Sequence, residues 1–437
     1  MDRSTGSADR HGDFPFAFIA FGLGTGILGG FLIGAYFAAA IGLSLPLGPG
    51  FPVLLQLHGH LQLMGWVGLF VMGISLYFIP RFASVPIRNP ENVRSVLALL
   101  VLGILLRGLS QGLMPFITSA GPGFNILKAG MAVSGILEFL GVAGYVVILA
   151  RTVRSFQRSA TDPTPLETVK PFFLMMLSGW ILYALLNLFL VIGVSGSSHF
   201  LLHQGWNELG IRIFLLLILL PVAFAFSIRT FPIFLGTPAP DWPVRPLALI
   251  YFISVLLQLF PQVAYADGWV SPWLDRALEA GMLLKDMTIL FLVWKLGVLT
   301  PSFLSRGHPA GLHPRARHPY KYSCLHDFGE FGKFELLIYS AYTWLTFGAI
   351  LEGITVLSFW FRGTIRIDSD PIQHSYMLGF ITLLILGMAV RMIPGFTGKR
   401  LASTGLVMAT FYLGNAAAAC RILPLLVPIS WIEGVAW

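Results

Sequence analysis

Eleven long apolar segments account for most of this chain and restrict it to one class of fold. A helix that crosses a bilayer needs about 20 apolar residues, and each segment is long enough. The segments predict an all-α membrane protein with 11 to 12 transmembrane helices. The tail from Leu423 to Trp437 is too short to span, so we expect a twelfth helix to be missing or to lie past the end of this sequence. The predicted spans lie at about 14–42, 54–79, 94–118, 126–150, 171–194, 203–228, 246–266, 275–298, 334–357, 373–393 and 402–422.

The composition and the distribution of charge agree with this class. Charged residues make up 11% of the chain and hydrophobic residues 56%, whereas soluble domains carry roughly 25% charged residues. The net charge of +8 gathers in alternate loops, which indicates membrane topology and no nucleic-acid partner. By the positive-inside rule the N-terminus is cytoplasmic, and the polar first residues indicate no cleaved signal peptide. The cationic loops contain Arg81, Arg88, Arg94, Arg151, Arg154, Arg158, Lys170, Arg306, Arg315, Arg317, Lys321, Lys399 and Arg400, whereas Arg362 and Arg366 depart from the pattern.

Three predicted helices end in the same way on the cytoplasmic side. Each has a proline followed two residues later by phenylalanine, at Pro80, Pro232 and Pro394, which are 152 and 162 residues apart. Each interval contains four predicted helices. The pattern therefore favours three pseudo-symmetric four-helix units, at 14–150, 171–298 and 334–437, within one polytopic domain over 1–437. The alternative is that proline, arginine and aromatic residues are common at any cytoplasmic helix end.

Histidines near the predicted outer face are the first candidates for chemistry. His60, Arg212 and His374 each lie 20 residues before the proline of their helix. His58 and His60 are two residues apart, so on a helix they point to nearly opposite faces. One of them would be a metal ligand and the other a ligand or a hydrogen-bonded structural residue. An ionisable residue in a membrane helix is costly without a partner, so these positions indicate a site for haem iron or copper.

His199 and His203 form a second candidate metal site. Their four-residue spacing places both imidazoles on one face if the segment is helical, and imidazole suits copper. Cys324 and Cys420 are predicted on opposite sides of the membrane, so we expect neither a disulfide nor a thiolate cluster. Met64 and Met377 follow His60 and His374 within one turn, where core packing is the alternative to metal ligation.

Further ionisable residues fall inside the spans. Arg107 and Arg212 are candidates to pair with haem propionates, because a guanidinium matches a carboxylate. The alternative is internal ion pairing, for example between Glu208 and Arg212, and Lys285 is a further buried charge. The glycines between Gly22 and Gly30 are predicted to permit close helix packing. The candidates for proton relay are Glu138, Glu208, Asp286 and Glu352.

The residues from His58 to Phe82, the block from Gln373 to Arg400, and the helix ending Cys420-Arg421-Ile422-Leu423-Pro424 resemble the NnrS family. The resemblance implies a bacterial inner-membrane protein of about twelve helices, with haem of b type and copper, linked to nitric oxide resistance. A more distant resemblance is to subunit I of haem-copper oxidases and nitric oxide reductases. It implies iron ligands at His58 or His60 and at His374, and a copper site beginning at His203.

The chain also departs from the oxidase pattern. The predicted helix at about 246–266 contains no histidine, the sixth predicted helix contains no tyrosine, and 373–393 contains one histidine in place of two. Respiratory oxygen reduction is therefore not expected.

The hypothesis that follows is a redox-active haem and copper protein of nitric oxide metabolism. If it is an enzyme, we expect an oxidoreductase that acts on nitric oxide or a related small molecule. Its ligands would be His58, His60, His199, His203 and His374, and its partners lipids, a small gas such as nitric oxide and an electron donor of unknown identity. A proton-coupled transporter and a haem or copper sensor without turnover are the alternatives.

Overall fold

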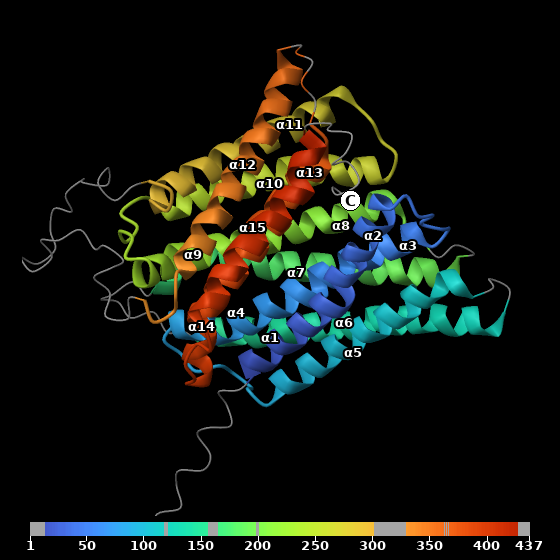
Figure 1. Ribbon diagram of the computed structural model, residues 1–437, viewed down its shortest axis with the longest axis horizontal. Helices are drawn as coiled ribbons and strands as arrows, with labels where there is room; N and C mark the ends of the chain where they lie inside the picture. Colours follow the sequence, from blue (N-terminus) through green and yellow to red (C-terminus); the bar gives the residue numbers. More distant parts are fainter. Residues whose placement is uncertain are drawn as a thin grey trace, which may run out of the picture.

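The computed structural model describes residues 14–117, 121–155, 165–197, 201–300 and 329–426, apart from 362, 364 and 366. These residues contain helices and no strands (Figure 1). Ten helices in this part are long and apolar enough to cross a membrane. The predicted span at about 275–298 corresponds to α11, Pro272–Leu296, which is similar in length but carries more charge and is not among these ten. The predicted all-α membrane fold is thus confirmed, while the type of membrane and the side of the N-terminus stay predictions.

The first four spans correspond to the first predicted unit. Three of these spans are joined from shorter helical segments without a break in the chain direction. The elements are α1 (Phe14–Thr25), η2 (Gly26–Phe31), α2 (Leu32–Gly42), α3 (Phe51–His60), η3 (Leu61–Gly68), α4 (Leu69–Phe82), α5 (Asn92–Leu113), η4 (Met114–Phe116) and α6 (Pro122–Arg154).

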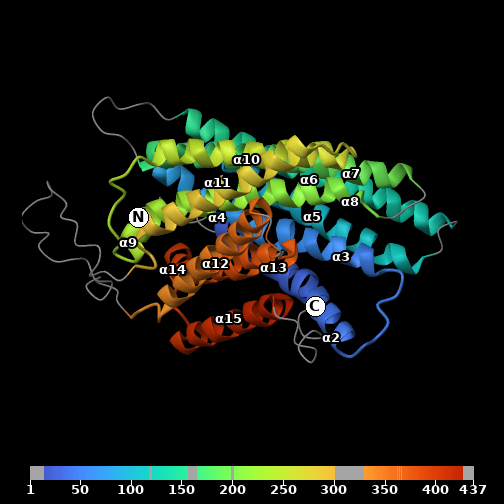
Figure 2. The same ribbon diagram turned by 90° about the horizontal axis from the view of Figure 1, so that it is seen from above.

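The remaining spans follow the same order. In Figure 2, α10 and α15 lie toward opposite edges of the bundle, with α8 and α12 between them. The elements are α7 (Pro165–Gly196), α8 (Gln204–Ile213), η5 (Phe214–Leu219), α9 (Leu220–Phe234), α10 (Val244–Ala266), α11, α12 (Phe334–Trp360), α13 (Ser369–His374), η7 (Ser375–Thr382), α14 (Leu383–Thr397) and α15 (Thr404–Leu426).

The second, sixth and tenth predicted helices share an unusual local geometry. Each contains a π-helical segment, and these segments begin directly after His60, Ile213 and His374. π-helical turns are rare and are frequent at functional sites. The apolar stretches of these three spans are also the most buried of the ten, at 89%, 89% and 56%. This common register supports the three-unit division, which stays a prediction.

The prolines of the repeated ends lie just inside their helices. The α4, α9 and α14 segments continue for two or three residues past Pro80, Pro232 and Pro394. A proline removes one backbone donor and crowds the preceding turn, so helices that contain one near the end stop soon after it. Gly398 then ends α14 with φ of +64°, a left-handed conformation that glycine adopts readily.

The first two spans pack closely through a row of glycines. A methyl group added at Gly22, Gly26, Gly30 or Gly34 would meet the second span, at Leu69, Trp66, Gln62 and His58 respectively. Small residues at such an interface let two helix backbones approach. The predicted packing role of this glycine-rich segment is therefore confirmed.

Another close approach holds α7 against the π-helical segment of the sixth predicted helix. A Cβ atom added at Gly179 would lie 2.6 Å from Leu217 Cβ and 3.0 Å from the Leu217 backbone carbonyl carbon. The adjacent Trp180 is fully buried and packs edge-on to Phe214, with ring centroids 5.2 Å apart. Since a backbone atom cannot rotate away, Gly179 sets the distance between the two elements.

We therefore expect Gly179→Ala to lower the free energy of unfolding by about 1–3 kcal/mol, the usual cost of overpacking. Gly193→Ala on the same helix is the matched control, because a Cβ atom there would meet nothing within 4 Å. The measurement is unfolding of both purified variants by titration with denaturing detergent. Equal stability of the two variants would contradict the close packing at Gly179.

Candidate functional site

The structure separates the two neighbouring histidines of the second span. The His58 Nδ1 atom lies 2.7 Å from the Gly30 carbonyl oxygen on the first span. The His60 Nε2 atom lies 3.1 Å from Glu138 Oε1 on α6. The two imidazoles therefore enter different environments, in agreement with the prediction that they point to nearly opposite faces.

The His58 imidazole packs against the first span at Gly34, where a larger residue would leave no room for it. A Cβ atom added at Gly34 would lie 2.9 Å from His58 Cε1. The Phe37 ring lies one turn further along, with its centroid 6.2 Å from that of the imidazole. The backbone carbonyl, the glycine and the phenylalanine together determine the orientation of the ring.

His374 is oriented by an acidic residue one turn earlier on α13. Its Nδ1 atom lies 2.9 Å from Asp370 Oδ1 and 3.0 Å from the Asp370 carbonyl oxygen. The other carboxylate oxygen, Oδ2, accepts a hydrogen bond from Arg421 Nη2 at 2.7 Å, and α15 supplies this arginine. The chain Arg421–Asp370–His374 thus links two helices and directs the imidazole.

His58 and His374 belong to one neighbourhood. His374 and Arg421 both lie within electrostatic reach of the His58 imidazole. Both views place α13 beside the end of the bundle formed by α2 and α3 (Figures 1 and 2). In each histidine Nδ1 has a hydrogen-bond partner, whereas Nε2 has none among the described residues. Two oriented imidazoles with unused Nε2 atoms form a donor set suited to a metal or to haem iron.

His60 belongs to a separate buried cluster. Its Nε2 contacts Glu138 Oε1, and the Tyr183 hydroxyl lies 3.4 Å from its Nδ1. Glu138 also accepts a hydrogen bond from Asn187 Nδ2 at 3.1 Å. His60 is 7% exposed and Glu138 is 1% exposed. Both His60 nitrogen atoms therefore already have protein partners, and its predicted role as an iron ligand stays a prediction.

Arg107 is fully buried near this cluster. Its Nε donates a hydrogen bond to Gln111 Oε1 at 2.7 Å, and the negative charge of Glu138 acts on its guanidinium. Its two Nη atoms are buried without a hydrogen-bond partner among the described residues. A buried donor is normally paired, often with water, so these atoms mark a place for an additional acceptor. Pairing of Arg107 with a haem propionate stays a prediction.

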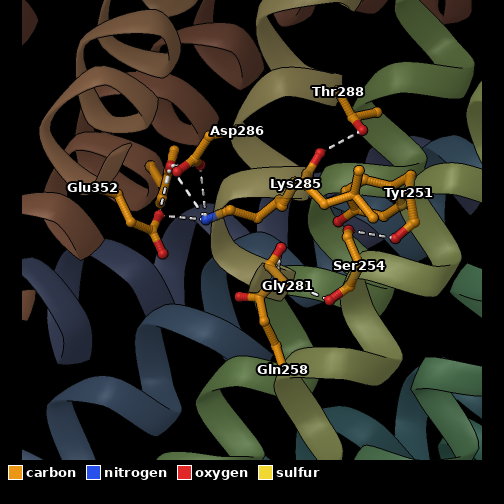
Figure 3. A network of polar contacts seen from close by, with 10 residues as sticks. Tyr251, Ser254, Gln258, Gly281, Lys285, Asp286, Thr288 and Glu352 are labelled. Atoms are coloured by element: carbon orange, nitrogen blue, oxygen red, sulfur yellow. Dashed lines mark hydrogen bonds and ion pairs between the residues drawn. The ribbon is translucent and has the colours of Figure 1, made fainter. Parts of the chain in front are cut away.

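A third polar cluster joins α11, α12 and η7. The Lys285 ammonium group contacts Glu352 and lies 3.3 Å from Asp286 Oδ1 (Figure 3). The Tyr376 hydroxyl lies 2.9 Å from Glu352 Oε2 and 3.3 Å from Asp286 Oδ1. Internal ion pairing, one of the two alternatives for these charges, is therefore present here.

A cavity of about 150 Å³ opens beside this cluster. Arg212 and Glu352 line it together with Lys285, Gln373 and Tyr376. The negative charges of Glu352 and Glu208 act on the Arg212 guanidinium. Glu208 itself is exposed and accepts a hydrogen bond from Gln204 Nε2 at 3.0 Å. Arg212 thus lines the cavity together with other polar side chains, and the predicted pairing with Glu208 is an electrostatic interaction between neighbouring turns.

The predicted copper pair can be followed only in part. His203 is exposed directly before α8, whereas His199 lies outside the described residues. The described part of the chain holds no group of three or more histidine, cysteine or acidic side chains that could bind a metal ion together. Met64 and Met377 pack in the hydrophobic core. Cys420 is exposed and Cys324 is outside the described residues, so the prediction of no disulfide stays open.

Several partners of these sites were not predicted from the sequence. Asp370 precedes His374 by four residues, so their contact was readable from helical spacing. The contributions of Arg421, Tyr376 and Asn187 depend on how distant helices meet, and no local pattern indicates them.

The buried contact between His60 and Glu138 leads to a stability prediction. Glu138→Ala removes the acceptor of both His60 and Asn187, and we expect it to lower the free energy of unfolding by roughly 3–5 kcal/mol. The control is Glu167→Ala, because Glu167 pairs with the exposed Arg245 and should contribute about 0–1 kcal/mol. Detergent-titration unfolding of both variants gives the comparison, and similar losses would show that burial of the first pair contributes nothing extra.

Comparison with known proteins gives one family. The family model described as NnrS protein matches residues 332–437. No curated protein matches the chain. The matched region contains Glu352, Asp370, His374 and Tyr376, and therefore contributes to two of the three polar clusters. The resemblance to haem-copper oxidases stays a prediction. Over residues 332–437 the chain carries an NnrS-family region, and the predicted resemblance to that family is confirmed there.

Proposed function

We propose that this protein binds haem in the membrane, takes part in the response to nitric oxide, and uses His58 and His374 as iron ligands. The observation that carries the proposal is that both histidines have engaged Nδ1 atoms and Nε2 atoms without a described partner, and that each lies within electrostatic reach of the other. The NnrS match supports a role in the nitric oxide response.

The surrounding residues fit such a role. Histidines that bind a metal almost always donate their second ring N–H to a carboxylate or a backbone carbonyl, which fixes the tautomer. Gly30 supplies the carbonyl for His58, and Asp370 supplies both kinds of acceptor for His374. A bound haem would supply an iron that binds diatomic gases and exchanges electrons.

The chain's own groups have defined tasks in this proposal. Asp370 holds the His374 ring, and Arg421 holds Asp370 from a different helix. The carboxylate also makes the imidazole a stronger electron donor, because negative charge at Nδ1–H raises the basicity of Nε2. Copper at His199 and His203, and redox turnover of nitric oxide, remain further parts of the same hypothesis.

A second candidate function is proton-coupled transport. The charged cluster at Lys285 beside a cavity favours it, since ionisable residues within membrane helices often mark proton or substrate paths. A colourless purified protein without haem would favour this second candidate.

The ligand assignment gives a direct spectroscopic prediction. His58→Ala and His374→Ala should each remove the visible haem bands, because each takes away one of the two imidazoles. His203→Ala should retain the bands, since His203 is exposed at the start of α8. The measurement is a reduced-minus-oxidised spectrum of each purified variant, followed by addition of nitric oxide to the wild type. Unchanged bands in the first two variants would refute the assignment of His58 and His374 as iron ligands. Absence of a spectral change after addition of nitric oxide would refute nitric oxide as a ligand of the wild-type protein.

The close contact between Gly34 and His58 allows a second test of the ligand assignment, in which both histidines are kept. Gly34→Ala places a methyl group 2.9 Å from His58 Cε1 and must displace the imidazole. We expect haem retention to fall roughly tenfold, the lower end of the effect of disturbing the residues that orient a ligand. Gly24→Ala on the same span is the control, because its Cβ would meet nothing within 4 Å. Haem-to-protein ratios decide the matter, and equal ratios would mean that the orientation of His58 is irrelevant to binding.

A further inference from the structure

The Lys285 cluster contains two carboxyl groups in unequal environments. Glu352 Oε2 accepts hydrogen bonds from the Lys285 ammonium group and from the Tyr376 hydroxyl. Arg212 also interacts electrostatically with the Glu352 carboxylate. Asp286 uses only Oδ1, in two contacts of 3.3 Å. Its Oδ2 is buried without a hydrogen-bond partner among the described residues. Glu352 is thus well suited to carry negative charge, whereas Asp286 is poorly suited.

The side-chain donors of the cluster sharpen this difference. Tyr376 has a single hydroxyl proton, and its shorter contact is with Glu352, at 2.9 Å against 3.3 Å to Asp286. Donation to Glu352 leaves the hydroxyl oxygen as an acceptor. A proton on Asp286 Oδ1 can then be donated to that oxygen. An ionised carboxylate with one unpaired oxygen is costly in an apolar interior, and protonation removes the charge.

The cavity provides a route by which such a proton exchanges. Glu352 lines the cavity and also contacts Tyr376. A volume of about 150 Å³ has room for several water molecules, and polar side chains in its otherwise mostly apolar lining can hold them by hydrogen bonds. Arg212 and Gln373 line the same space and offer donors to water.

We propose that Asp286 is a proton-binding site, which holds a proton at neutral pH and exchanges it with water in the cavity through Tyr376 and Glu352. In the transfer, the Asp286 O–H bond breaks and its proton binds the Tyr376 hydroxyl oxygen. The original hydroxyl proton of Tyr376 passes to Glu352 Oε2, so the tyrosine stays neutral. Glu352 then releases one proton to cavity water, and Asp286 is left as a carboxylate. The inference stands without haem, because none of these groups is a proposed ligand.

Infrared difference spectroscopy of the full-length purified protein tests the site. The wild-type minus Asp286→Asn spectrum should contain the C=O stretch of one protonated carboxylic acid. The wild-type minus Glu352→Gln spectrum should contain the stretching bands of an ionised carboxylate, because Glu352 carries the negative charge. If the Asp286 difference contains only carboxylate bands, or if the acid band is assigned to Glu352, the proposal is overturned.

A measurement on the wild type protects the test against variants that do not fold. On transfer to D₂O the acid band should shift to lower frequency, because the proton exchanges with cavity water. Met282 lines the cavity, so a Met282→Trp variant should fill part of the space and slow the rate of this exchange about tenfold. Gly34→Ala should keep the band, which separates this inference from the haem proposal. Absence of any acid band in the wild type, or a band that never shifts, would overturn the proposal.

Discussion

Every charged side chain in the middle of this bundle must find its partner inside the protein, because a bilayer core offers no water. That constraint explains why the buried ionisable residues occur in clusters. His60 at the end of α3 contacts Glu138 on α6, and Lys285 on α11 contacts Glu352 on α12 as well as the adjacent Asp286. These contacts join helices from different parts of the chain. The same groups that stabilise the bundle are therefore the ones available for chemistry.

The glycine row on the first span serves this arrangement. Without side chains at Gly26, Gly30 and Gly34, the first span approaches the second closely enough for His58 to reach a backbone carbonyl. A larger residue at Gly34 would meet the His58 imidazole directly. One at Gly26 or Gly30 would meet Trp66 or Gln62 and separate the two spans. Helix packing and the orientation of His58 thus depend on the same interface.

Hydropathy alone predicted most of the fold, because each span is long enough to need no other signal. The glycine packing was also readable, since small residues recur at helical spacing. The sites were predictable only where the information was local. The two-residue spacing of His58 and His60 indicated opposite faces, and the structure agrees. It could not indicate which histidine would lie nearer His374, because that depends on how the second and tenth predicted helices are placed in the bundle. Arg421 and Asp370 come from such distant helices, and only the assembled bundle brings them together.

The common register of His60, Arg212 and His374 takes on a clearer meaning in the structure. His60 and His374 lie directly before a π-helical segment, and a single residue separates Arg212 from one. A π-helical turn inserts one extra residue and so rotates the side chains that precede it relative to those that follow. The polar side chain at the repeated position nevertheless has a different neighbour in each case. His60 faces Glu138, Arg212 faces the cavity, and His374 faces Asp370. The neighbouring residues, not the repeated position itself, decide whether that side chain joins a buried polar contact, lines a cavity or contacts an acidic residue.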